Sequence, residues 1–550
     1  MNNAEMINIA EELIKKNNFN QAENIYLKIL EANPGDAYAL SKLGLINIYK
    51  SDFKNAENFL ELALKIGHDL ETLKKLAFVK ERLFQYYDAI VMYEQIIELE
   101  PNEAYYDIVQ NLYNKVELYD NEIEIAKKRV EQYGSVDAYT RLFNLYISIG
   151  RAEELKELKS EIEKKFPNKA FVYDLFGIYE EFIEEDLDAA ETFYNKSIKM
   201  GLKNAAYDLA VCYRKHHKYL EAEKCCRKIL KDYPDQESIL YTYASIFFTE
   251  KRMHQGYKYY LQRGKLPQHK NLKNPWDGKA HPKDILLVMA EQGYGDSLMM
   301  ARYFQFLTDK FETVKVAVPE TLVDLFSTNF EQIKNSNIEI MPSSDVYSTV
   351  YNWSVLMMDL PYRLNMTFHN IPESKGYLSC SELKYDYFKN KYFENKKLKV
   401  GLCWRAKGEG FRVALQRTID INYYLKDLFD IENVEYYSLQ KDDIFDVKNN
   451  FPQIVDLSGD LDSFEDTAAA LKNLDLFISI DSAPAHLAGA LGVKTLLLLP
   501  FCPEWRWFDN DKKTEWYSNM EIFKQKVGEN WSSATIPLIE RVKEIAEKKR

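Results

Sequence analysis

The first half of the chain repeats one pattern of large and small apolar positions about every 34 residues. In each unit a large residue precedes a small one by three positions, early in the second helix of a predicted helix pair. Two weaker units, around Tyr119 and Arg151, fill the one long gap in the series, so eight repeats fit. The pairs are Phe19/Ala22, Phe53/Ala56, Tyr86/Ala89, Leu187/Ala190, Tyr219/Ala222 and, in a weakened form, Met253/Gly256.

Four prolines fall between these units, where helix terminators are expected: Pro34, Pro101, Pro167 and Pro234. A helix-turn-helix of this length, with small residues where the helices cross, resembles the tetratricopeptide repeat. The resemblance covers residues 1–268 and implies a superhelix with a concave groove. We expect the groove to bind a peptide or a protein acceptor. The alternative is that the repeats only form a homo-oligomer or support the second half.

The pattern changes after residues 269–283, a basic and proline-rich segment without periodicity that we interpret as a linker. Short apolar runs of strand length then alternate with helical segments. This alternation is typical of a parallel α/β fold, here as two Rossmann-like domains over residues 284–390 and 396–550. The predicted strands are DILLVM, VKVAVP, IEIMPS and SVLMMDLP in the first domain, and KVGLCW, EYYSLQ, QIVDL, DLFISI and KTLLLLP in the second.

The most informative stretch of the second domain is DLFISIDSAPAHLAGALGVKTLLLLP, which runs from Asp475 to Pro500. It reads as a strand, a tight loop, a helix and a second strand. Such a loop lies at the carboxyl edge of a parallel sheet, where the free N–H groups of the helix attract anions. Asp481 and Ser482 alone would be helix caps, and His486 alone a surface histidine. Together they favour a diphosphate or sugar site.

A second polar turn, EQGYGD, follows the first strand of the first domain. Gly293 and Gly295 allow the backbone of this turn a wide range of conformations and a close approach to other groups. We expect the helix beside them to begin at Asp296 and Ser297 and to end at about Lys310. GxGxxG dinucleotide loops start in the same way, but the third glycine and the acidic residue after the second strand are missing. The sequence therefore disfavours a dinucleotide-dependent oxidoreductase.

These turns belong to a set of segments that resemble the heptosyltransferase-like family 9 glycosyltransferases, in the subgroup fused to tetratricopeptide repeats. The segments are EQGYGDSLMMARY, VGLCWRAKGEGFRVALQRTI, YYSLQ, DTAAALKNLDLFISIDSAPAHLAGALG, and LLLLPFCPEWRWF followed by WYSNMEIFKQ, in order over about residues 284–531. The resemblance implies a GT-B fold, a nucleotide-activated sugar donor, inversion at the anomeric carbon, and no metal or other cofactor. The layout is also similar to the O-GlcNAc transferases and to tetratricopeptide flagellin glycosyltransferases. That likeness would make the acceptor a protein, such as flagellin or another surface protein.

By the resemblance, Asp296 is the base that takes the proton of the acceptor hydroxyl, and a helix cap is its alternative role. For the departing phosphate, His486 and the helix N–H groups after Asp481 can donate hydrogen bonds, and a basic cluster supplies charge. The residues that we expect to bind the donor are Gly293, Gly295, Arg405, Lys407, Arg412, Arg417, Gln440, Asp481, Ser482, Ala483, His486, Glu504 and Arg506.

Two segments depart from the heptosyltransferases. GEGFRVALQRT replaces their lysine-bearing loop, which leaves the sugar and the nucleotide of the donor open. In PEWRWF, Glu504 and Arg506 either line the donor site or pack against the carboxyl-terminal helix. Asp509-Asn510-Asp511 has the form of a DxD metal triplet, but it follows an aromatic loop rather than a strand, so we expect a solvated turn and no metal site.

Charge and compartment narrow the range of partners. The formal net charge of −13 disfavours nucleic-acid binding, although residues 201–282, with 16 Lys and Arg against 8 Asp and Glu, are suited to an acidic surface. Without a signal peptide or an apolar run that could span a bilayer, we expect a cytoplasmic protein with no transmembrane segment. The leading interpretation is a protein glycosyltransferase. The alternatives are a catalytically inactive adaptor or chaperone, and a transferase that acts on a lipid or a glycan.

Overall fold

The computed structural model describes residues 3–50, 52–67, 69–116, 118–184, 186–265, 272–332, 336–372, 376–406, 417–441, 444–510 and 512–549. Two of the predicted donor-binding residues, Lys407 and Arg412, lie outside this set, as does Asp511. The chain forms two compact units, Met1–Lys165 and Phe166–Arg550, which are described separately below.

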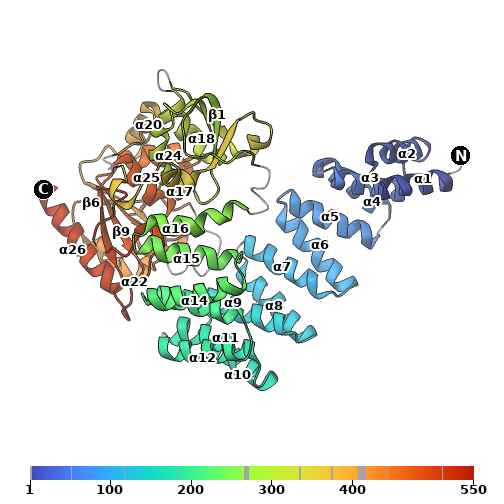
Figure 1. Ribbon diagram of the computed structural model, residues 1–550, viewed down its shortest axis with the longest axis horizontal. Coiled ribbons are helices and arrows are strands. Elements are labelled where there is room, and N and C mark those ends of the chain that lie inside the picture. The colour runs from blue at the N-terminus through green and yellow to red at the C-terminus, as the bar shows by residue number, and fades with distance from the viewer. Residues whose placement is uncertain are drawn as a thin grey trace. The chain divides into compact units, whose positions relative to one another are not determined.

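The first unit consists of antiparallel helix pairs, each made of two amphipathic helices of similar length (Figure 1). The second helix of a pair begins at the large residue of the repeated motif, and the small residue three positions later is fully buried, as at Ala22, Ala56 and Ala89. Only a small side chain allows two helices to approach this closely. The helices are α1 (Asn3–Lys15), α2 (Phe19–Ala32), α3 (Ala37–Tyr49), α4 (Phe53–Ile66), α5 (Leu70–Arg82), α6 (Tyr86–Leu99), α7 (Glu103–Lys115), α8 (Tyr119–Tyr133), α9 (Val136–Ile149) and α10 (Ala152–Lys165).

The second unit begins with further helix pairs of the same design. Their second helices start at Leu187, Tyr219 and Met253, again as the motif predicts. The predicted series of eight helix pairs is therefore confirmed within the described residues. The elements are α11 (Ala170–Tyr179), the π-helix η1 (Glu180–Glu184), α12 (Leu187–Lys199), α13 (Asn204–Lys215), α14 (Tyr219–Asp232), α15 (Glu237–Thr249), α16 (Met253–Tyr260) and the 3₁₀-helix η2 (Leu261–Lys265).

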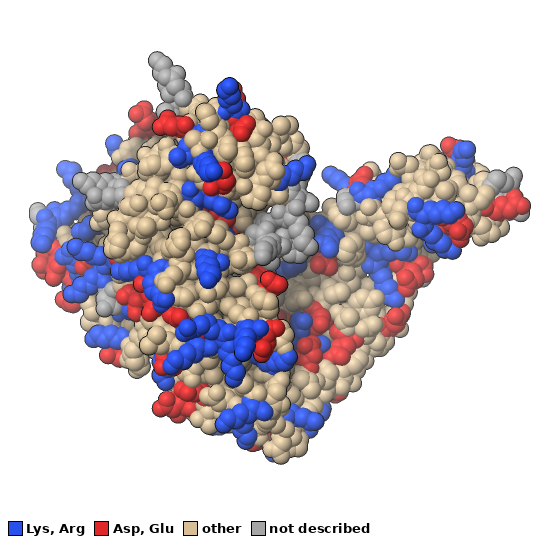
Figure 2. Space-filling view, viewed as in Figure 1, with Lys and Arg blue, Asp and Glu red and all other residues tan. Residues whose placement is uncertain are grey.

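Exposed basic side chains mark this part of the chain. Lys224, Lys228 and Lys231 follow one face of α14 at intervals of four and three residues, and all three are exposed. Figure 2 shows Lys and Arg gathered over the region that Figure 1 labels α14. Part of the basic excess of residues 201–282 thus lies on the exposed surface of α14.

A four-stranded parallel sheet follows the repeats, with the strand order β3-β2-β1-β4. Its central strand is buried because Leu286, Leu287 and Val288 are covered on both faces. The predicted long helix after β1 is wrong: α17 ends after seven residues and continues as the 3₁₀-helix η4. The elements are β1 (His281–Met289), α17 (Tyr294–Met300), η4 (Ala301–Phe306), β2 (Phe311–Val318), α18 (Glu320–Phe326), β3 (Ile338–Pro342) and β4 (Trp353–Leu356).

A six-stranded parallel sheet completes the unit, with the order β10-β9-β8-β5-β6-β7. Five of its strands coincide with predicted ones, although β7 is only two residues long. The edge strand β10 was not predicted. The elements that concern the site are β5 (Leu398–Cys403), β6 (Val434–Ser438), β7 (Val455–Asp456), α24 (Phe464–Lys472), β8 (Leu476–Ile480), α25 (Ala483–Leu491), β9 (Thr495–Leu499), β10 (Met520–Lys524) and α26 (Ser532–Lys549).

The last repeat and the first sheet share one hydrophobic core. Phe248 of α15 packs against Trp505, with ring centroids 4.6 Å apart, and the Tyr257 hydroxyl of α16 donates a hydrogen bond to the Met358 carbonyl at 3.0 Å. Trp505 lies in the segment between β9 and β10, which therefore contacts the repeats. The second unit is a parallel α/β body with helical repeats built into it.

None of the helices in the described part of the chain is both long enough and apolar enough to cross a membrane.

Candidate functional site

The strand order of each sheet defines one crevice at its carboxyl edge. In the first sheet, β2 and β4 flank β1 on opposite sides: the chain passes from β1 to β2 and β3 on one side and then crosses back to β4 on the other. In the second sheet, β5 and β8 are related in the same way. Ligands of parallel α/β sheets bind at such topological switch points. Both polar turns from the sequence, EQGYGD after β1 and DSAPAH after β8, lie at these positions.

The two switch points meet where α17 contacts α25. A Cβ atom added to Gly295 would lie 2.6 Å from Cδ2 of His486, so a glycine is required here for close approach rather than for its φ angle. Tyr294 and Phe464 also pack together across this contact, with ring centroids 5.1 Å apart. Residues about 190 positions apart, predicted separately, therefore lie side by side.

Asp296 forms a buried ion pair with Arg506, which comes from the loop after β9. Nη2 of Arg506 donates to Oδ2 of Asp296 at 2.8 Å, Nε donates to Oδ1, and Nη2 also donates to the Gln292 side chain at 2.9 Å. Burial by itself would lower the pKa of Arg506, but the adjacent Asp296 carboxylate raises it well above the ordinary value. The guanidinium is thus a permanent charge that holds both oxygens of Asp296.

This pairing corrects two expectations. Gly293 caps α17 and the helix begins at Tyr294, so Asp296 lies within the first turn and caps nothing. Arg506 does not pack against the carboxyl-terminal helix, because it faces Asp296 of the first sheet. Glu504 lies beside it, with 3.8 Å between Oε2 of Glu504 and Nη1 of Arg506.

A second buried ionic cluster holds the start of the loop that follows β1. Nε of Arg263, at the end of the repeats, donates to Oε2 of Glu291 at 3.0 Å, and its Nη2 lies 2.7 Å from Oδ1 of Asp359. Burial raises the pKa of Glu291 to about 6, although Arg263 acts against the rise. The repeats therefore position the residues that follow β1 and β4.

His486 is a buried and neutral imidazole. Burial is the main cause that lowers its pKa, to about 3; the Asp296 carboxylate acts to raise this pKa, and Arg506, Arg302 and Arg417 act to lower it. Its ring stacks on Trp507 at 4.7 Å, and Nδ1 lies 3.0 Å from the Tyr517 hydroxyl. When the hydroxyl donates to Nδ1, the single imidazole N–H is on Nε2. His486 can donate one hydrogen bond but carries no charge at neutral pH.

The start of α25 differs from the prediction in one residue. Ser482 alone is the cap: its Oγ accepts from the N–H of Ala485 at 3.4 Å, while Asp481 is buried and paired with Arg417. Nη1 of Arg417 lies 3.3 Å from Oδ2 of Asp481 and 3.4 Å from its carbonyl oxygen. Ala483 opens the helix, and Gly492 ends it at φ 74°, as expected.

Gln440 supports the neighbouring loop instead of presenting a free amide. Its Oε1 accepts from the N–H groups of Trp404 and Arg405, both at 3.1 Å, and its Nε2 donates to the Arg405 carbonyl at 3.0 Å. The Arg405 side chain donates to both oxygens of Asp446, at 2.9 and 2.7 Å. Gln440 therefore fixes the backbone that follows β5, and Arg405 forms a surface ion pair.

Sequence reasoning missed Arg302 of η4. The side chain is 2% exposed, donates to the Trp516 carbonyl at 2.8 Å, and lies over the rings of Tyr377, Trp516 and Tyr517. No carboxylate pairs with it among the residues that the structure describes. Arg302 appears in the sequence as an isolated arginine in a helical segment, so no local pattern indicated that it would be buried.

The charges of the site favour an anion. Arg302, Arg417 and Arg506 contribute three positive charges, which the carboxylates of Asp296, Asp481 and Glu504 balance, and the first N–H groups of α25 add a partial positive charge. In a site with little water these charges act more strongly than at the surface. The arrangement is suited to a phosphate or diphosphate group.

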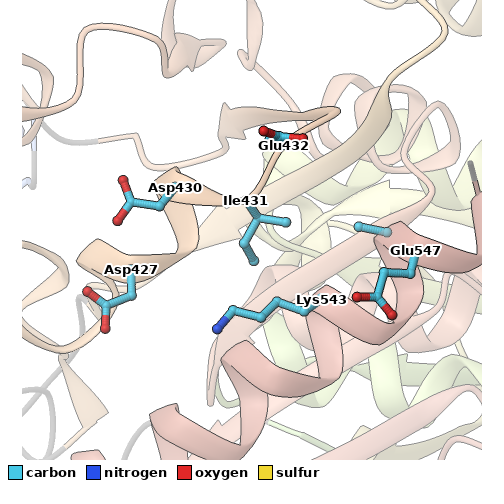
Figure 3. Close-up of a pocket in the computed structure, with 7 residues that line it drawn as sticks. Asp427, Asp430, Ile431, Glu432, Lys543 and Glu547 are labelled. Atoms are coloured by element: carbon cyan, nitrogen blue, oxygen red, sulfur yellow. The ribbon is translucent and has the colours of Figure 1, made fainter.

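The cavity in Figure 3 lies at a different edge of the second sheet. It encloses about 410 Å³ between η9 (Lys426–Asp430) and α26, and the residues that line it are Asp427, Asp430, Ile431, Glu432, Lys543, Ala546 and Glu547. Residues 427–432 of this lining precede β6, whereas the site residues follow β5 and β8, so the cavity lies near the amino end of β6. Four carboxylates around one lysine repel a phosphate, so this is not the donor site.

Asp509 does not form the expected solvated turn. Its Oδ2 lies 2.7 Å from Nδ1 of His217 in the repeats, and Nζ of Lys524 donates to Oδ1 at 2.9 Å. Burial opposes its charge, but these two partners hold the pKa of the Asp509 carboxyl well below its usual range. Within the described residues, no group of three or more His, Cys, Asp and Glu side chains is arranged to hold a metal ion.

No protein family model and no curated protein matches the chain. Solved structures of tetratricopeptide repeat proteins are similar to part of it. The C-terminal part of such a protein from Cytophaga hutchinsonii is 14% identical and covers 42% of this chain and 98% of its own, with a TM-score of 0.33. Yeast Tom70 is 17% identical and covers 46% of this chain and 55% of its own, with a TM-score of 0.32. YrrB, described as a repeat protein with an unusual peptide-binding site, is 16% identical over 32% of this chain and 92% of its own, with a TM-score of 0.26.

Proposed function

We propose that the protein is an inverting, metal-independent glycosyltransferase with a GT-B arrangement of its two sheets. It would transfer a sugar from a nucleotide-activated donor to a hydroxyl group of a protein acceptor that the repeats bind. The observation that carries the proposal is the contact of Gly295 with His486, which joins the carboxylate of one parallel sheet to the anion-binding helix end of the other. A transferase needs both groups within reach of one anomeric carbon.

In this mechanism the donor diphosphate binds at the start of α25. The helix N–H groups, Nε2 of His486 and the Arg417 guanidinium stabilise the negative charge that develops on the leaving phosphate oxygen. These groups are in position before the reaction, so little reorganisation is required when the bond to the phosphate breaks.

Asp296 would take the proton as the acceptor oxygen attacks the anomeric carbon from the opposite side. The new carbon–oxygen bond forms while the bond to the diphosphate breaks, which inverts the configuration. Arg506 occupies one lone pair on each carboxylate oxygen, and a carboxylate offers about four such sites, so the anion can still accept a proton. Arg506 would also fix the direction in which Asp296 meets the acceptor.

Mass spectrometry of candidate acceptors tests the proposal. Flagellin and other surface proteins would be co-expressed with the chain, with a variant carrying Asp296→Asn and Arg506→Gln, and without either. A gain of one sugar mass per site is expected only with the unaltered chain. In parallel, the purified protein would be incubated with a panel of nucleotide sugars to detect donor hydrolysis. If the protein neither transfers a sugar nor hydrolyses any of the donors, the proposed function is contradicted.

Removal of divalent cations should leave this activity unchanged. The diphosphate would be neutralised by helix N–H groups and guanidinium side chains, which take over the usual task of Mg²⁺ or Mn²⁺. The check is the initial transfer rate with EDTA against the rate with added Mg²⁺. An absolute requirement for either metal would contradict the metal-independent mechanism.

One feature favours a different function, that of a protein adaptor without catalysis. Both oxygens of Asp296 are held by Arg506, an arrangement that also serves to stabilise a fold. An adaptor would bind its protein partner through the repeats and neither bind nor hydrolyse nucleotide sugars. The donor panel described above separates the two functions.

A further inference from the structure

One face of α14 exposes one apolar and four basic side chains to solvent (Figure 2). These five residues, which fall within an arc of about 100° on a helix that turns by about 100° per residue, are Leu220, Lys224, Arg227, Lys228 and Lys231. Leu220 is 64% exposed although it is apolar. Two exposed carboxylates, Glu221 and Asp232, border this α14 face but lie outside its arc. The charges within the α14 face are therefore all positive.

The lysines of the α14 face have no ionic partner. Within the described residues, the side chains of Lys224, Lys228 and Lys231 make no ion pair, hydrogen bond or ring contact. Arg227 has only a loose one, since its Nη2 lies 3.6 Å from Oε2 of Glu223. Like charges three and four positions apart on a helix repel one another. An anion that binds this face would relieve that repulsion.

The α14 face lies on the outer side of the repeats. The first helices of successive pairs contact one another, α11 with α13 and α13 with α15, and α14 packs against α13 and α15. Stacked helix pairs come closest on their concave side, so the first helices line the groove and α14 lies on the convex side. An extended peptide binds in a groove, and a convex helix face does not provide one. A broad surface can reach it.

An aromatic and basic pair extends the α14 face beyond the end of the helix. Nζ of Lys203 lies 4.5 Å from the centroid of the Tyr233 ring, and both residues are exposed. Tyr233 directly follows α14. Tyrosine and leucine side chains among lysines are suited to the layer between lipid headgroups and acyl chains, where an apolar body and a polar or charged end are both accommodated.

We propose that the α14 face binds the surface of a membrane that contains anionic lipids. The lysines would contact the phosphate and carboxylate groups of the lipids, and Leu220 would enter the layer beneath them. Lysine is a point charge on a flexible stem, so each side chain can follow mobile headgroups without a fixed geometry. The groove on the other side of the repeats would stay open to a protein. This inference does not depend on the proposed sugar transfer.

A nucleic acid and an acidic protein fit the α14 face less well. The formal net charge of −13 repels a long polyanion that extends past this face, whereas charges at a bilayer surface act over about 8–10 Å at physiological salt. A nucleic acid would also leave Leu220 exposed. The carboxylates of a protein are typically held by the paired N–H groups of arginine, but three of the four cations here are lysines.

Cosedimentation of the full-length protein with vesicles tests the proposal. Vesicles of phosphatidylcholine with about 30% phosphatidylserine should bind the protein, and vesicles of phosphatidylcholine alone should not. Raising NaCl to about 0.5 M should release most of the bound protein, because salt screens the attraction. Changing Lys224, Lys228 and Lys231 together to Gln should lower the partition coefficient about a hundredfold, since each lysine at an anionic surface contributes about fivefold.

The matched control changes Lys396, Lys397 and Lys426 to Gln. These exposed lysines lie before β5 and in η9, their side chains make no ion pair among the described residues, and their loss alters the net charge equally. The control should bind within about twofold of the unaltered protein, because distant charges are screened. Arg at the three α14 positions should retain binding. Leu220→Ser should weaken it about three- to tenfold, through the apolar contact that is lost.

The proposal is overturned if the anionic vesicles do not bind the protein, if both kinds of vesicle bind it equally, or if the control loses as much binding as the α14 variant. Fluorescence anisotropy with poly-glutamate and with a single-stranded RNA covers the other anions. If either binds through the same three lysines and vesicles do not, the α14 face belongs to an acidic protein or to RNA, and the proposal fails. If vesicles bind but no donor is hydrolysed, the membrane site stands and the proposed transferase activity fails.

Discussion

At the scale of single residues, Asp296 has two tasks that one substitution cannot separate. Asp296→Asn removes the counter-charge of Arg506, and a buried ion pair that loses one member typically costs about 3–5 kcal/mol. The same substitution would remove the proposed base. A loss of activity in this variant alone would therefore be ambiguous.

The double variant Asp296→Asn, Arg506→Gln separates the structural role of Asp296 in the ion pair from its proposed role as the base. Removing both charges should restore most of the stability lost in the single variant, as measured by urea unfolding. If Asp296 is the base, sugar transfer should stay at least about a hundredfold below that of the unaltered protein even though the fold has recovered. Near-normal turnover in the double variant would exclude Asp296 as the base.

His486 makes the fold sensitive to acid. Its pKa is lowered to about 3 in the folded protein and is near 6.5 in the unfolded chain, so below pH 6.5 the unfolded state binds a proton that the folded state does not. The free energy of unfolding should therefore fall as the pH drops from about 6.5 towards 3, by an amount on the order of a few kcal/mol. The stability that depends on a neutral His486 should be fully retained above pH 6.5.

The measurement is urea unfolding at several pH values for the unaltered protein and for His486→Gln. Glu291 acts in the opposite sense between about pH 4.5 and 6, because its pKa is raised to about 6. The difference between the two proteins isolates the histidine, since Glu291 is common to both. A difference that is constant over this range would contradict a neutral buried imidazole.

At the scale of elements, the approach of α17 to α25 depends on one missing side chain. In Gly295→Ala the new Cβ would lie 2.6 Å from the His486 ring, which cannot yield easily because it stacks on Trp507 and binds Tyr517. We expect a loss of about 1–3 kcal/mol in the free energy of unfolding.

Gly293→Ala is the control for this substitution. A Cβ at Gly293 would meet only an Asp296 oxygen at 4.0 Å, and its φ of −62° suits any residue. Thermal or urea unfolding should show a change within about 0.5 kcal/mol for Gly293→Ala. Similar losses in both variants would mean that the helix contact is not the cause.

The elements that the sequence predicts well are those with a local cause. The first residues of the second repeat helices follow from the large and small pair, since packing of a neighbouring helix requires a small residue there. Ser482 and Gly492 bound α25 because capping is decided within a few residues. β10 was missed because the short segment MEIFK, in which two of five residues are charged, has no clear strand pattern of its own and pairs with β9 in the structure.

The partners of the site residues could not be predicted in the same way. Asp296 and Arg506 are 210 positions apart, and nothing near either residue indicates the other. The sequence therefore offered candidate residues, but it could not show that Gln440 supports a loop or that Asp509 binds the repeats. Those roles arise only after the two sheets and the last repeats have packed together.

At the scale of the whole molecule, the boundary between the compact units suggests where the chain can be cut. Residues 166–550 keep the last repeats with the sheets, whereas residues 270–550 would expose the faces of Trp505 and Met358 that α15 and α16 cover. Unfolding should be cooperative for residues 166–550 and either absent or much less stable for residues 270–550. Circular dichroism during heating measures this.

If the first repeats recruit the acceptor, residues 166–550 should hydrolyse donor and modify short peptides at near-normal rates. They should lose most transfer to an intact acceptor protein, because the acceptor is no longer held at high effective concentration. Transfer to the intact protein would be compared for the full chain and residues 166–550 at equal enzyme concentration. Equal rates would assign the first repeats to assembly instead.

The contact between Phe248 and Trp505 also has a consequence for synthesis on the ribosome. The apolar face of α15 and α16 emerges early, but Trp505, which packs on Phe248, lies 257 residues after it in the chain. At about 5–20 residues per second, that face waits on the order of 10–50 s before its partner is made. Within residues 3–165 each helix packs on its neighbours in the chain, so these contacts can form as the helices are made. The nascent second unit, and not the first, is therefore the part of this protein that most needs a chaperone while it is being translated.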